Sequence, residues 1–218
     1  MESSEKNKYL KMLVEEFHSA VVATIGRDGF PQTRMIDMML WDREGIYFLT
    51  ARGKEFYRQL MEQKFIAVSA GRDKKAVSVR GRIRNIGSWR LDEIFEKNVY
   101  MQEIYPEGTR DVLEVFQLYE ALGEYFDISV PSRVVRERFT VGNLQEVPGG
   151  YEIDGKCVGC GKCQAVCPQK CIDIQKVPAV IDQNRCLHCG RCADRCPVKA
   201  IVRRQEESRW NRRSAGDI

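Results

Sequence analysis

The sequence predicts a mainly β fold with some α: a six-stranded antiparallel split β-barrel followed by a small α+β domain. Three observations lead to this prediction. Short runs of strand-forming residues, joined by tight turns, fill residues 19–141 without the strand–helix alternation of parallel sheets. All nine cysteines lie after residue 156. Pro148-Gly149-Gly150 forms a turn-rich stretch between these two parts.

The chain is long enough for one medium-sized core and one small core, with 218 residues of which 43% are hydrophobic. We therefore expect four segments. They are a barrel domain at 1–142, a linker at 143–154, a cysteine-rich domain at 155–204 and a basic tail at 205–218.

Individual elements follow from hydrophobic spacing. Residues 5–17 are expected to form an amphipathic helix, since apolar residues recur at helical intervals from Leu10 to Phe17. The Asp28-Gly29 pair predicts a hairpin turn. The expected strands are 19–25, 32–40, 46–51, 65–71, 76–86, 115–121, 124–130 and 135–141, and the further expected helices are 53–63 and 88–98. In the helix at 53–63, one face is expected to contain Phe56, Tyr57, Leu60 and Met61.

Two cysteine runs of the same design lie 29 residues apart, CVGCGKCQAVCP at 157–168 and CLHCGRCADRCP at 186–197. Each has three cysteines at intervals of three, then a fourth cysteine followed by proline. A [4Fe–4S] cluster needs four thiolates, and this spacing is typical of its ligands. Zinc sites commonly use CxxC pairs separated by a longer gap, and a disulfide framework would require an exported protein.

At these residues the segment resembles the bacterial-type two-cluster ferredoxins, in which the fourth cysteine of each run binds the other cluster. The implied ligands are Cys157, Cys160, Cys163 and Cys196 for cluster I, and Cys186, Cys189, Cys192 and Cys167 for cluster II. Cys171 and His188 align with Ala200 and Gly159 of the other repeat, so we expect both to be structural.

Charge and hydropathy narrow the class of protein. Residues 1–150 have a net charge of −1 and residues 151–218 of +5. This basic excess would balance the negative charge of two clusters, so no nucleic-acid partner is expected. The N-terminal residues lack the apolar core of a signal peptide and no apolar run is long enough to span a membrane. We expect a cytoplasmic protein without a membrane partner.

One group of residues in the first domain indicates a phosphate site. Thr50 ends a strand, Lys54 begins the next helix, and Arg34 lies on a neighbouring hairpin strand. A hydroxyl, two cations and the free amides of a helix N-terminus together suit a phosphate. Their spacing alone does not distinguish a phosphate site from surface residues that lie near one another by chance.

The order of elements adds weight to this interpretation. HSAVVATIGRDGFPQTRMI, IYFLTARGKEFYRQL, AVSVRGRIRNI and VFQLYEALGEYFDIS together resemble the pyridoxamine 5′-phosphate oxidase-like FMN-binding split-barrel family over residues 8–142. The resemblance implies a homodimer that holds FMN at its subunit interface. The implied flavin contacts are Arg34, the backbone of Met35 and Ile36, Leu49, and Thr50 with Lys54 for the phosphate.

The sequence departs from the oxidase itself. Met39 lies where the oxidase has a lysine, and residues 115–126 contain neither the tryptophan nor the histidine of the substrate signature. We therefore do not expect oxidation of pyridoxamine phosphate. The residues suggest no nucleophile or acid–base pair either, so catalytic residues stay unknown and the cofactors must supply the chemistry.

These features predict an iron–sulfur flavoprotein oxidoreductase. Two clusters would take single electrons from a low-potential donor and pass them to FMN, which would reduce a small-molecule acceptor. Two alternatives stay open. One is a non-enzymatic electron carrier that acts on a protein partner, and the other is a barrel that binds another ligand such as a deazaflavin or haem.

Overall fold

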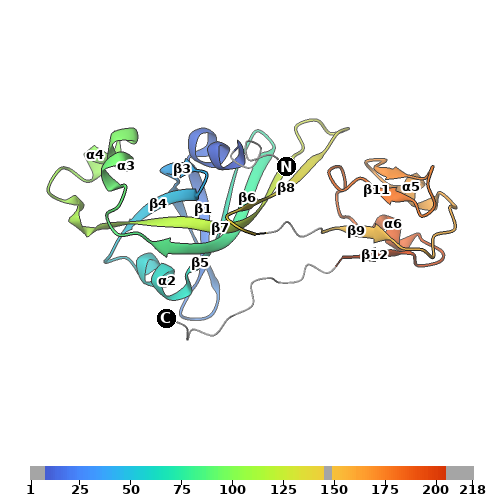
Figure 1. Ribbon diagram of the computed structural model, residues 1–218, viewed down its shortest axis with the longest axis horizontal. Helices are drawn as coiled ribbons and strands as arrows, with labels where there is room; N and C mark the ends of the chain where they lie inside the picture. Colours follow the sequence, from blue (N-terminus) through green and yellow to red (C-terminus); the bar gives the residue numbers. More distant parts are fainter. Residues whose placement is uncertain (1–7, 145–148, 205–218) are drawn as a thin grey trace. The chain divides into compact units, whose positions relative to one another are not determined.

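The computed structural model describes residues 8–144 and 149–204 (Figure 1). The chain divides into two compact units, which are described separately. They are Met1–Ser129 with Glu137–Glu146, and Val130–Arg136 with Val147–Ile218. The expected basic tail at 205–218 and Pro148 of the expected linker lie outside the described residues. Among the helices of the described part, none is long and apolar enough to cross a membrane.

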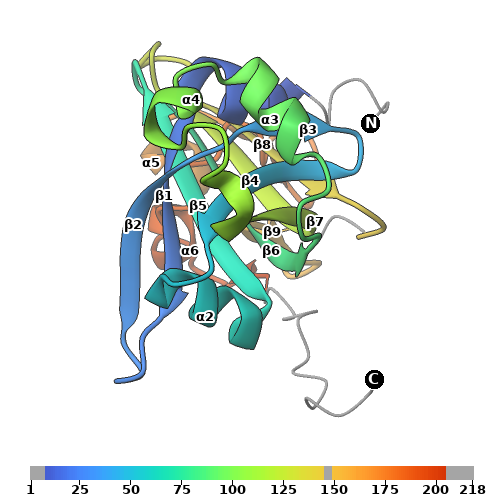
Figure 2. The same cartoon turned by 90° about the vertical axis from the view of Figure 1, so that its left-hand side faces the viewer.

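The first unit is built on one antiparallel sheet. Its order is β2 (Pro31–Asp37), β1 (Ser19–Ile25), β5 (Phe65–Arg72), β6 (Lys75–Asn85), β7 (Leu113–Asp127), β4 (Gly45–Ala51) and β3 (Leu40–Asp42), with β8 (Val135–Val141) paired to β7. The two ends of this order, β2 and β3, are joined by only Met38 and Met39. The sheet must therefore curl so that β2 and β3 approach each other at this link, and Figure 2 shows the resulting half-barrel. The predicted fold class is confirmed, although the sheet of the described residues has eight strands where the sequence predicts six.

Two predicted strands differ from the structure. Residues 32–40 form two strands, because the chain changes its partner from β1 to β4 at Met38 and Met39, which are both buried. The predicted pair 115–121 and 124–130 is the single long strand β7. Gly123 lies within β7 because a Cβ there would be 2.2 Å from the ring of Phe139 on β8. This glycine therefore marks close packing between strands and does not mark a turn.

Helices cover parts of the sheet. They are α2 (Glu55–Gln63), α3 (Leu91–Lys97), α4 (Met101–Ile104) and the 3₁₀ turn η2 (Arg110–Val112). In α2 the buried residues are Phe56, Gln59 and Leu60, whereas Met61 is 42% exposed. The prediction that Met61 lies on the buried face of α2 is thus wrong, and the prediction did not include Gln59, which is buried.

The predicted N-terminal helix is only partly α-helical. Residues 8–11 are α-helical, and η1 (Met12–Phe17) is a π-helix that ends with the His18 amide bonded to the carbonyl of Leu13. The predicted apolar residues do face the core, since Leu10, Leu13 and Val14 are buried.

A charged cluster fixes the start of α3. Arg90 donates to Glu93 at 2.8 Å and to Asp42 at 2.5 Å, and its guanidinium lies 4.3 Å from the ring centre of Tyr47. Hydrogen bonds from Arg90 and Lys97 lower the pKa of Glu93 to about 2. This cluster ties α3 to β3 and β4.

The second unit is a duplicated structure. It contains β9 (Tyr151–Ile153), α5 (Lys162–Val166), β10 (Ile172–Asp173), β11 (Val180–Ile181), α6 (Arg191–Asp194) and β12 (Ile201–Arg203). The hairpin β10–β11 follows the first cysteine run, and β9 pairs with β12. β9 lies within the segment that the sequence predicts as a linker. The six-residue core of this unit is Cys171, Ile172, Ala179, Ile181, Cys186 and Ile201.

Candidate functional site

Arg34 lies at the centre of a polar network on the inner face of the barrel. Strand pairing places it beside Val22, which is fully buried, and so on the core side of β2. Its guanidinium stacks 4.4 Å from the ring centre of Phe56 in α2. Burial lowers the pKa of Arg34, and the nearby carboxylate of Glu55 raises it. Arginine stays protonated under either influence.

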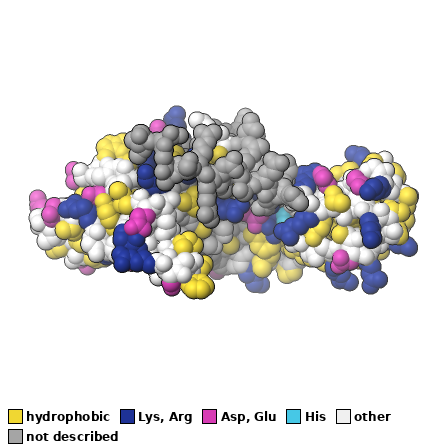
Figure 3. Space-filling model, turned by 90° about the horizontal axis from the view of Figure 1, so that it is seen from below, with side chains coloured by type: hydrophobic (Ala, Val, Ile, Leu, Met, Phe, Trp, Pro, Cys, Tyr) yellow, Lys and Arg dark blue, Asp and Glu magenta, His cyan; other side chains and the backbone are white. Residues whose placement is uncertain are grey.

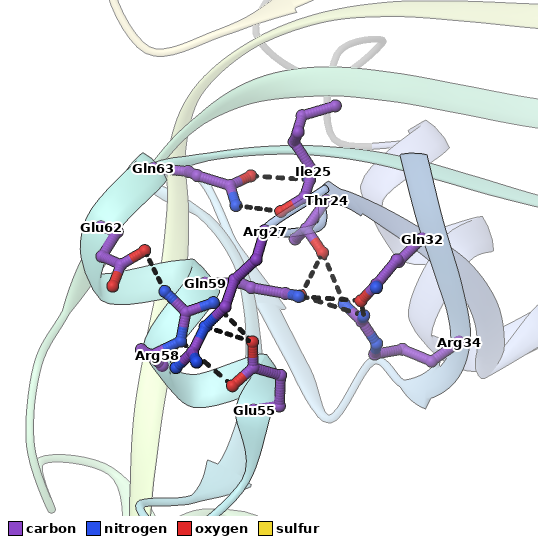
Figure 4. A network of polar contacts seen from close by, with 10 residues as sticks. All are labelled: Thr24, Ile25, Arg27, Gln32, Arg34, Glu55, Arg58, Gln59, Glu62 and Gln63. Atoms are coloured by element: carbon purple, nitrogen blue, oxygen red, sulfur yellow. Dashed lines mark hydrogen bonds and ion pairs between the residues drawn. The ribbon is translucent and has the colours of Figure 1, made fainter. Parts of the chain in front are cut away.

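Figure 4 shows how this guanidinium is held. Arg34 donates through Nη1 to the Thr24 hydroxyl at 2.7 Å and through Nη2 to Gln59 Oε1 at 3.0 Å. Thr24 also donates to Gln59 at 2.6 Å, and Gln59 donates to Gln32 at 2.8 Å. Because a guanidinium has five N–H donors, part of the fork is left for a further acceptor. The network therefore holds the Arg34 guanidinium in one orientation before a ligand binds.

Thr50 provides the clearest sign of a missing ligand. It is 3% exposed, and its hydroxyl has no hydrogen-bond partner among the described residues. Such a group is costly to bury, so natural proteins seldom leave one unpaired. Thr50 follows Phe48 on the same face of β4, and Phe48 stacks on Phe56. The orphaned hydroxyl and Arg34 are therefore linked through the first turn of α2.

The start of α2 completes the group. Lys54 is the extended residue before the helix, and no side chain caps the amides of its first turn. Lys54 is exposed, and its ammonium has no partner among the described residues. Uncapped amides at a helix N-terminus favour an anion. A hydroxyl donor, two cations and free amides are the groups that suit a phosphate.

Glu55 is a carboxylate in this first turn and would oppose an anion. The structure pairs it with cations instead: Glu55 bonds to Arg58 at 2.5 Å and lies 3.6 Å from Arg27 (Figure 4). Hydrogen bonds from Arg58 hold the pKa of Glu55 below its usual value. Its charge is thus balanced by Arg58 within the helix and by Arg27 in the turn between β1 and β2.

The other predicted flavin contacts are placed differently. Met35 is 61% exposed, on the opposite face of β2 from Arg34, while Ile36 is half-buried on the same face as Arg34. The side chain of Leu49 packs into an apolar cluster with Tyr47 and is not grouped with Thr50. Because β2 ends the sheet, one edge of its backbone lacks a neighbouring strand among the described residues and is available for hydrogen bonding.

Sequence reasoning found no context for His18, but the structure places it in a polar group. His18 Nε2 lies 3.0 Å from the hydroxyl of Tyr100, which donates to Asp37 at 2.6 Å. Desolvation alone would raise the pKa of Asp37, but hydrogen bonds from Ser19 and Tyr100 outweigh it and lower the pKa. The contact depends on residues far apart in sequence, which no local spacing reveals.

In the second unit, the structure brings the cysteines together in two groups. One open cavity of about 390 Å³ is lined by Cys157, Cys160, Cys163 and Cys196. Another, of about 360 Å³, is lined by Cys186, Cys189, Cys192 and Cys167, together with Cys171. These are the quartets assigned from the sequence to clusters I and II, so we call the cavities I and II.

The backbone of the two repeats is also equivalent. Left-handed conformations recur at Gly159 and His188, at Gly161 and Gly190, and at Lys170 and Lys199. Among the described residues, no three potential ligand side chains come close enough to chelate a single ion. A four-iron cluster keeps its ligands further apart than zinc, which binds sulfur at about 2.3 Å. Each cavity is lined by one of the predicted cysteine quartets, and four is the number of thiolates that a [4Fe–4S] cluster needs.

Comparison with known families agrees with this geometry. Residues 7–118, just over half of the chain, match the family model described as pyridoxamine 5′-phosphate oxidase. The chain belongs to the pyridoxamine 5′-phosphate oxidase family. Residues 156–200 of this family member match the model of a 4Fe-4S dicluster domain. Both resemblances inferred from the sequence are confirmed, and the chain joins a flavin-binding type of oxidoreductase domain to a ferredoxin domain.

Solved structures show the same fold for the pyridoxamine 5′-phosphate oxidase domain. A NimC/NimA family protein from Clostridium acetobutylicum matches with 14% identity and a TM-score of 0.53, covering 63% of this chain and 94% of its own. PhzG from Burkholderia lata 383, in complex with tetrahydrophenazine-1-carboxylic acid, matches with 18% identity and a TM-score of 0.50, covering 70% and 86%. No curated protein matches the sequence.

Proposed function

We propose that this protein is an iron–sulfur flavoprotein oxidoreductase, in which two [4Fe–4S] clusters pass single electrons to FMN and FMN reduces a small-molecule acceptor. One observation carries the proposal. The same chain holds two cavities lined by cysteine quartets and a barrel in which the buried hydroxyl of Thr50 lacks a partner beside an uncapped helix N-terminus. Each feature suits one of the two redox cofactors.

In the barrel, the protein's role is to position the flavin. Arg34, held by Thr24 and Gln59, would bind one side of the phosphate, while Thr50 and Lys54 would bind the other. The edge of β2 that lacks a neighbouring strand among the described residues would hydrogen-bond the ring. When bound, FMN supplies the ability to collect single electrons and release them as a pair.

In the second unit, backbone amides already donate to cysteine sulfur. The amide of His188 lies 3.4 Å from Cys186 Sγ, and the amide of Ala200 lies 3.2 Å from Cys196 Sγ. Each cavity therefore has at least one such bond to its ligand set. Hydrogen bonds to sulfur stabilise negative charge and thereby favour the reduced form of a cluster.

Pyridoxamine phosphate is not the proposed substrate, despite the family. Met39, at the position of the oxidase lysine, is 6% exposed and packs in an apolar cluster with Tyr47 and Leu91. A buried thioether offers no cation to a substrate phosphate. Aerobic incubation with pyridoxamine phosphate should produce no hydrogen peroxide above background.

The proposal includes a homodimer formed through the barrel. On the outer face of β1 and β2, Val21 pairs with Met35, and these side chains are 40% and 61% exposed. Ile25 on the same face is 46% exposed. A group of exposed apolar residues on the two strands at the edge of a sheet is a typical interface. Light scattering should give twice the chain mass, and Met35→Lys should shift the protein towards the monomer.

Anaerobic stopped-flow reduction tests the electron path. Reconstituted protein is mixed with increasing dithionite while cluster and flavin absorbance are followed separately. Bleaching of the clusters should accelerate with dithionite, whereas flavin reduction should reach a rate that no longer depends on it, as expected for transfer within the molecule. A Cys189→Ala variant should lose one cluster and with it this limiting rate, while Cys171→Ala should behave as wild type.

The outcomes separate the possible functions. If flavin reduction stays proportional to dithionite, or is unaffected by loss of a cluster, the clusters do not feed the flavin and the proposal fails. If the reduced protein transfers electrons only to protein partners and not to quinones, nitro compounds or enones, it is a carrier. If the absorption spectrum of the purified protein lacks flavin bands, the barrel binds a ligand other than FMN.

A further inference from the structure

The two ends of the cluster-binding unit differ although its sequence is duplicated. Cavity I is bordered by four exposed apolar side chains, which we call the apolar rim. They are Val158 and Val177, each 63% exposed, and Ile174 and Val198, each 37% exposed. Val158, Ile174 and Val198 line the cavity directly, and Val177 lies beside Gly159 of its cysteine loop.

The equivalent positions at cavity II are not exposed apolar residues. Leu187, the counterpart of Val158, is only partly exposed. Gln169, the counterpart of Val198, accepts from the Val134 amide at 3.2 Å and donates to the Pro131 carbonyl at 3.3 Å. Segment 130–136 of the chain itself therefore covers part of the cavity II side. The matching position at cavity I is left open.

Basic side chains also surround the open end. Four lysines, all exposed, adjoin cavity I or its rim in sequence: Lys156, Lys162, Lys176 and Lys199. Only Lys156 is near a carboxylate, 3.9 Å from Asp154, and the other three ammonium groups have no partner among the described residues. Figure 3 shows basic and apolar side chains interspersed on the visible face of this unit. An approaching protein would meet these exposed ammonium groups before the half-buried sulfur atoms of Cys157 and Cys163.

We propose that the apolar rim and its lysines form the docking surface for an acidic redox protein, which delivers one electron at a time to cluster I. Each transfer oxidises the donor by one electron and reduces the cluster by one, with no proton or bond exchanged. A small apolar centre surrounded by charges is the usual form of a transient electron-transfer interface, below about 1,200 Å² in area. Complementary charge speeds such encounters.

This inference rests on the proposed function, because it names the donor's contact site, but it is tested by binding alone. The duplication supplies a matched pair of variants. Lys162 beside cavity I and Arg191 beside cavity II occupy the same position of the cysteine motif, and both are exposed. Lys162→Glu and Arg191→Glu change the net charge of the full chain equally and differ only in the end of the unit that they alter.

The probe is an acidic two-cluster ferredoxin, whose anaerobic affinity for the reconstituted full-length protein is measured by surface plasmon resonance. Wild-type Kd should increase about tenfold between about 50 and 200 mM NaCl. Lys162→Glu should raise the low-salt Kd about tenfold, and Arg191→Glu less than about twofold. Iron content and flavin binding should be unchanged in both variants. Lys176→Glu, outside the cysteine motif, repeats the test if Lys162→Glu loses iron.

An equal loss of affinity in the Lys162 and Arg191 variants, or the absence of any binding by the wild type, would overturn the docking surface. So would a change of molecular mass in the Lys162→Glu variant, because a second copy of this chain would then occupy the rim. The proposed function fails separately, through missing iron or missing flavin, and neither result depends on the ferredoxin probe.

Discussion

Replacing Thr50 with valine is the sharpest test of the flavin site, because stability and affinity should change in opposite directions. The Thr50 hydroxyl is buried and has no partner among the described residues. Valine keeps the β-branched shape and suits a strand. Removing an unpaired buried hydroxyl should raise the free energy of unfolding of the flavin-free protein by about 1–2 kcal/mol.

Flavin affinity should fall in the same variant. A hydroxyl that donates to a phosphate oxygen makes a hydrogen bond to a charged group, which contributes about 1.5–3 kcal/mol. The Kd for FMN should therefore rise about 10- to 100-fold. Both effects together are expected only if the hydroxyl is reserved for the ligand.

Two measurements suffice. Urea unfolding of the flavin-free protein is followed by tryptophan fluorescence, which reports on the barrel through Trp41 and Trp89. FMN affinity is measured by quenching of flavin fluorescence. Thr24→Val is the control, because this buried hydroxyl bonds to both Gln59 and Arg34 and its loss should destabilise the barrel. If Thr50→Val also destabilises the flavin-free protein, or leaves the Kd unchanged, the hydroxyl does not bind phosphate.

Three further predictions follow from the same contacts. Arg34→Lys keeps the charge but loses the planar group stacked 4.4 Å from a phenylalanine ring, so the Kd for FMN should rise about tenfold. The same change at exposed Arg27 should leave the Kd unchanged, and equal effects of the two changes would contradict the role of Arg34 in flavin binding. Cys171→Ala should retain about eight irons per chain by iron analysis, whereas Cys167→Ala should retain about four, and the reverse result would exchange their roles. Hydrogen bonds from neighbouring arginine and lysine side chains lower the pKa of Glu93 from 4.5 to about 2. The contribution of Glu93 to stability is therefore complete above pH 4.5 and is lost as the pH falls towards 2. Urea unfolding at several acidic pH values should show a shallower loss in Glu93→Gln than in wild type, and identical slopes would exclude this contribution.

Features set by neighbouring residues could be predicted from the sequence. The Asp28-Gly29 turn forms as expected, with Gly29 at φ 81° and its amide bonded to the carbonyl of Gly26. In β6, Val77, Val79 and Ile83 are buried while Arg80 is exposed, as the alternation predicts. The cysteine quartets line common cavities because their spacing within each run already limits the geometry.

Features set by strand exchange could not be predicted. Residues 32–40 divide into β2 and β3 because β2 pairs with β1 whereas β3 pairs with β4. Met38 and Met39, which connect the two strands, are both buried. β7 likewise continues through Gly123, which a local pattern interprets as a break. In both cases tertiary packing outweighs the local signal.

Gln59 shows most clearly why the flavin site was only partly predictable. On α2 it follows Phe56 by three residues and so lies on the same face, where the helical pattern predicts an apolar side chain. Its complete burial is tolerated because three other polar side chains, all of them on the β1–β2 hairpin and far away in sequence, satisfy its amide. A buried, fully bonded polar group is costly to assemble and adds rigidity rather than much stability. Gln59 therefore makes sense as the residue that aims Arg34, and a glutamine on the apolar face of the helix after a predicted phosphate loop is the sequence signal that could have revealed it.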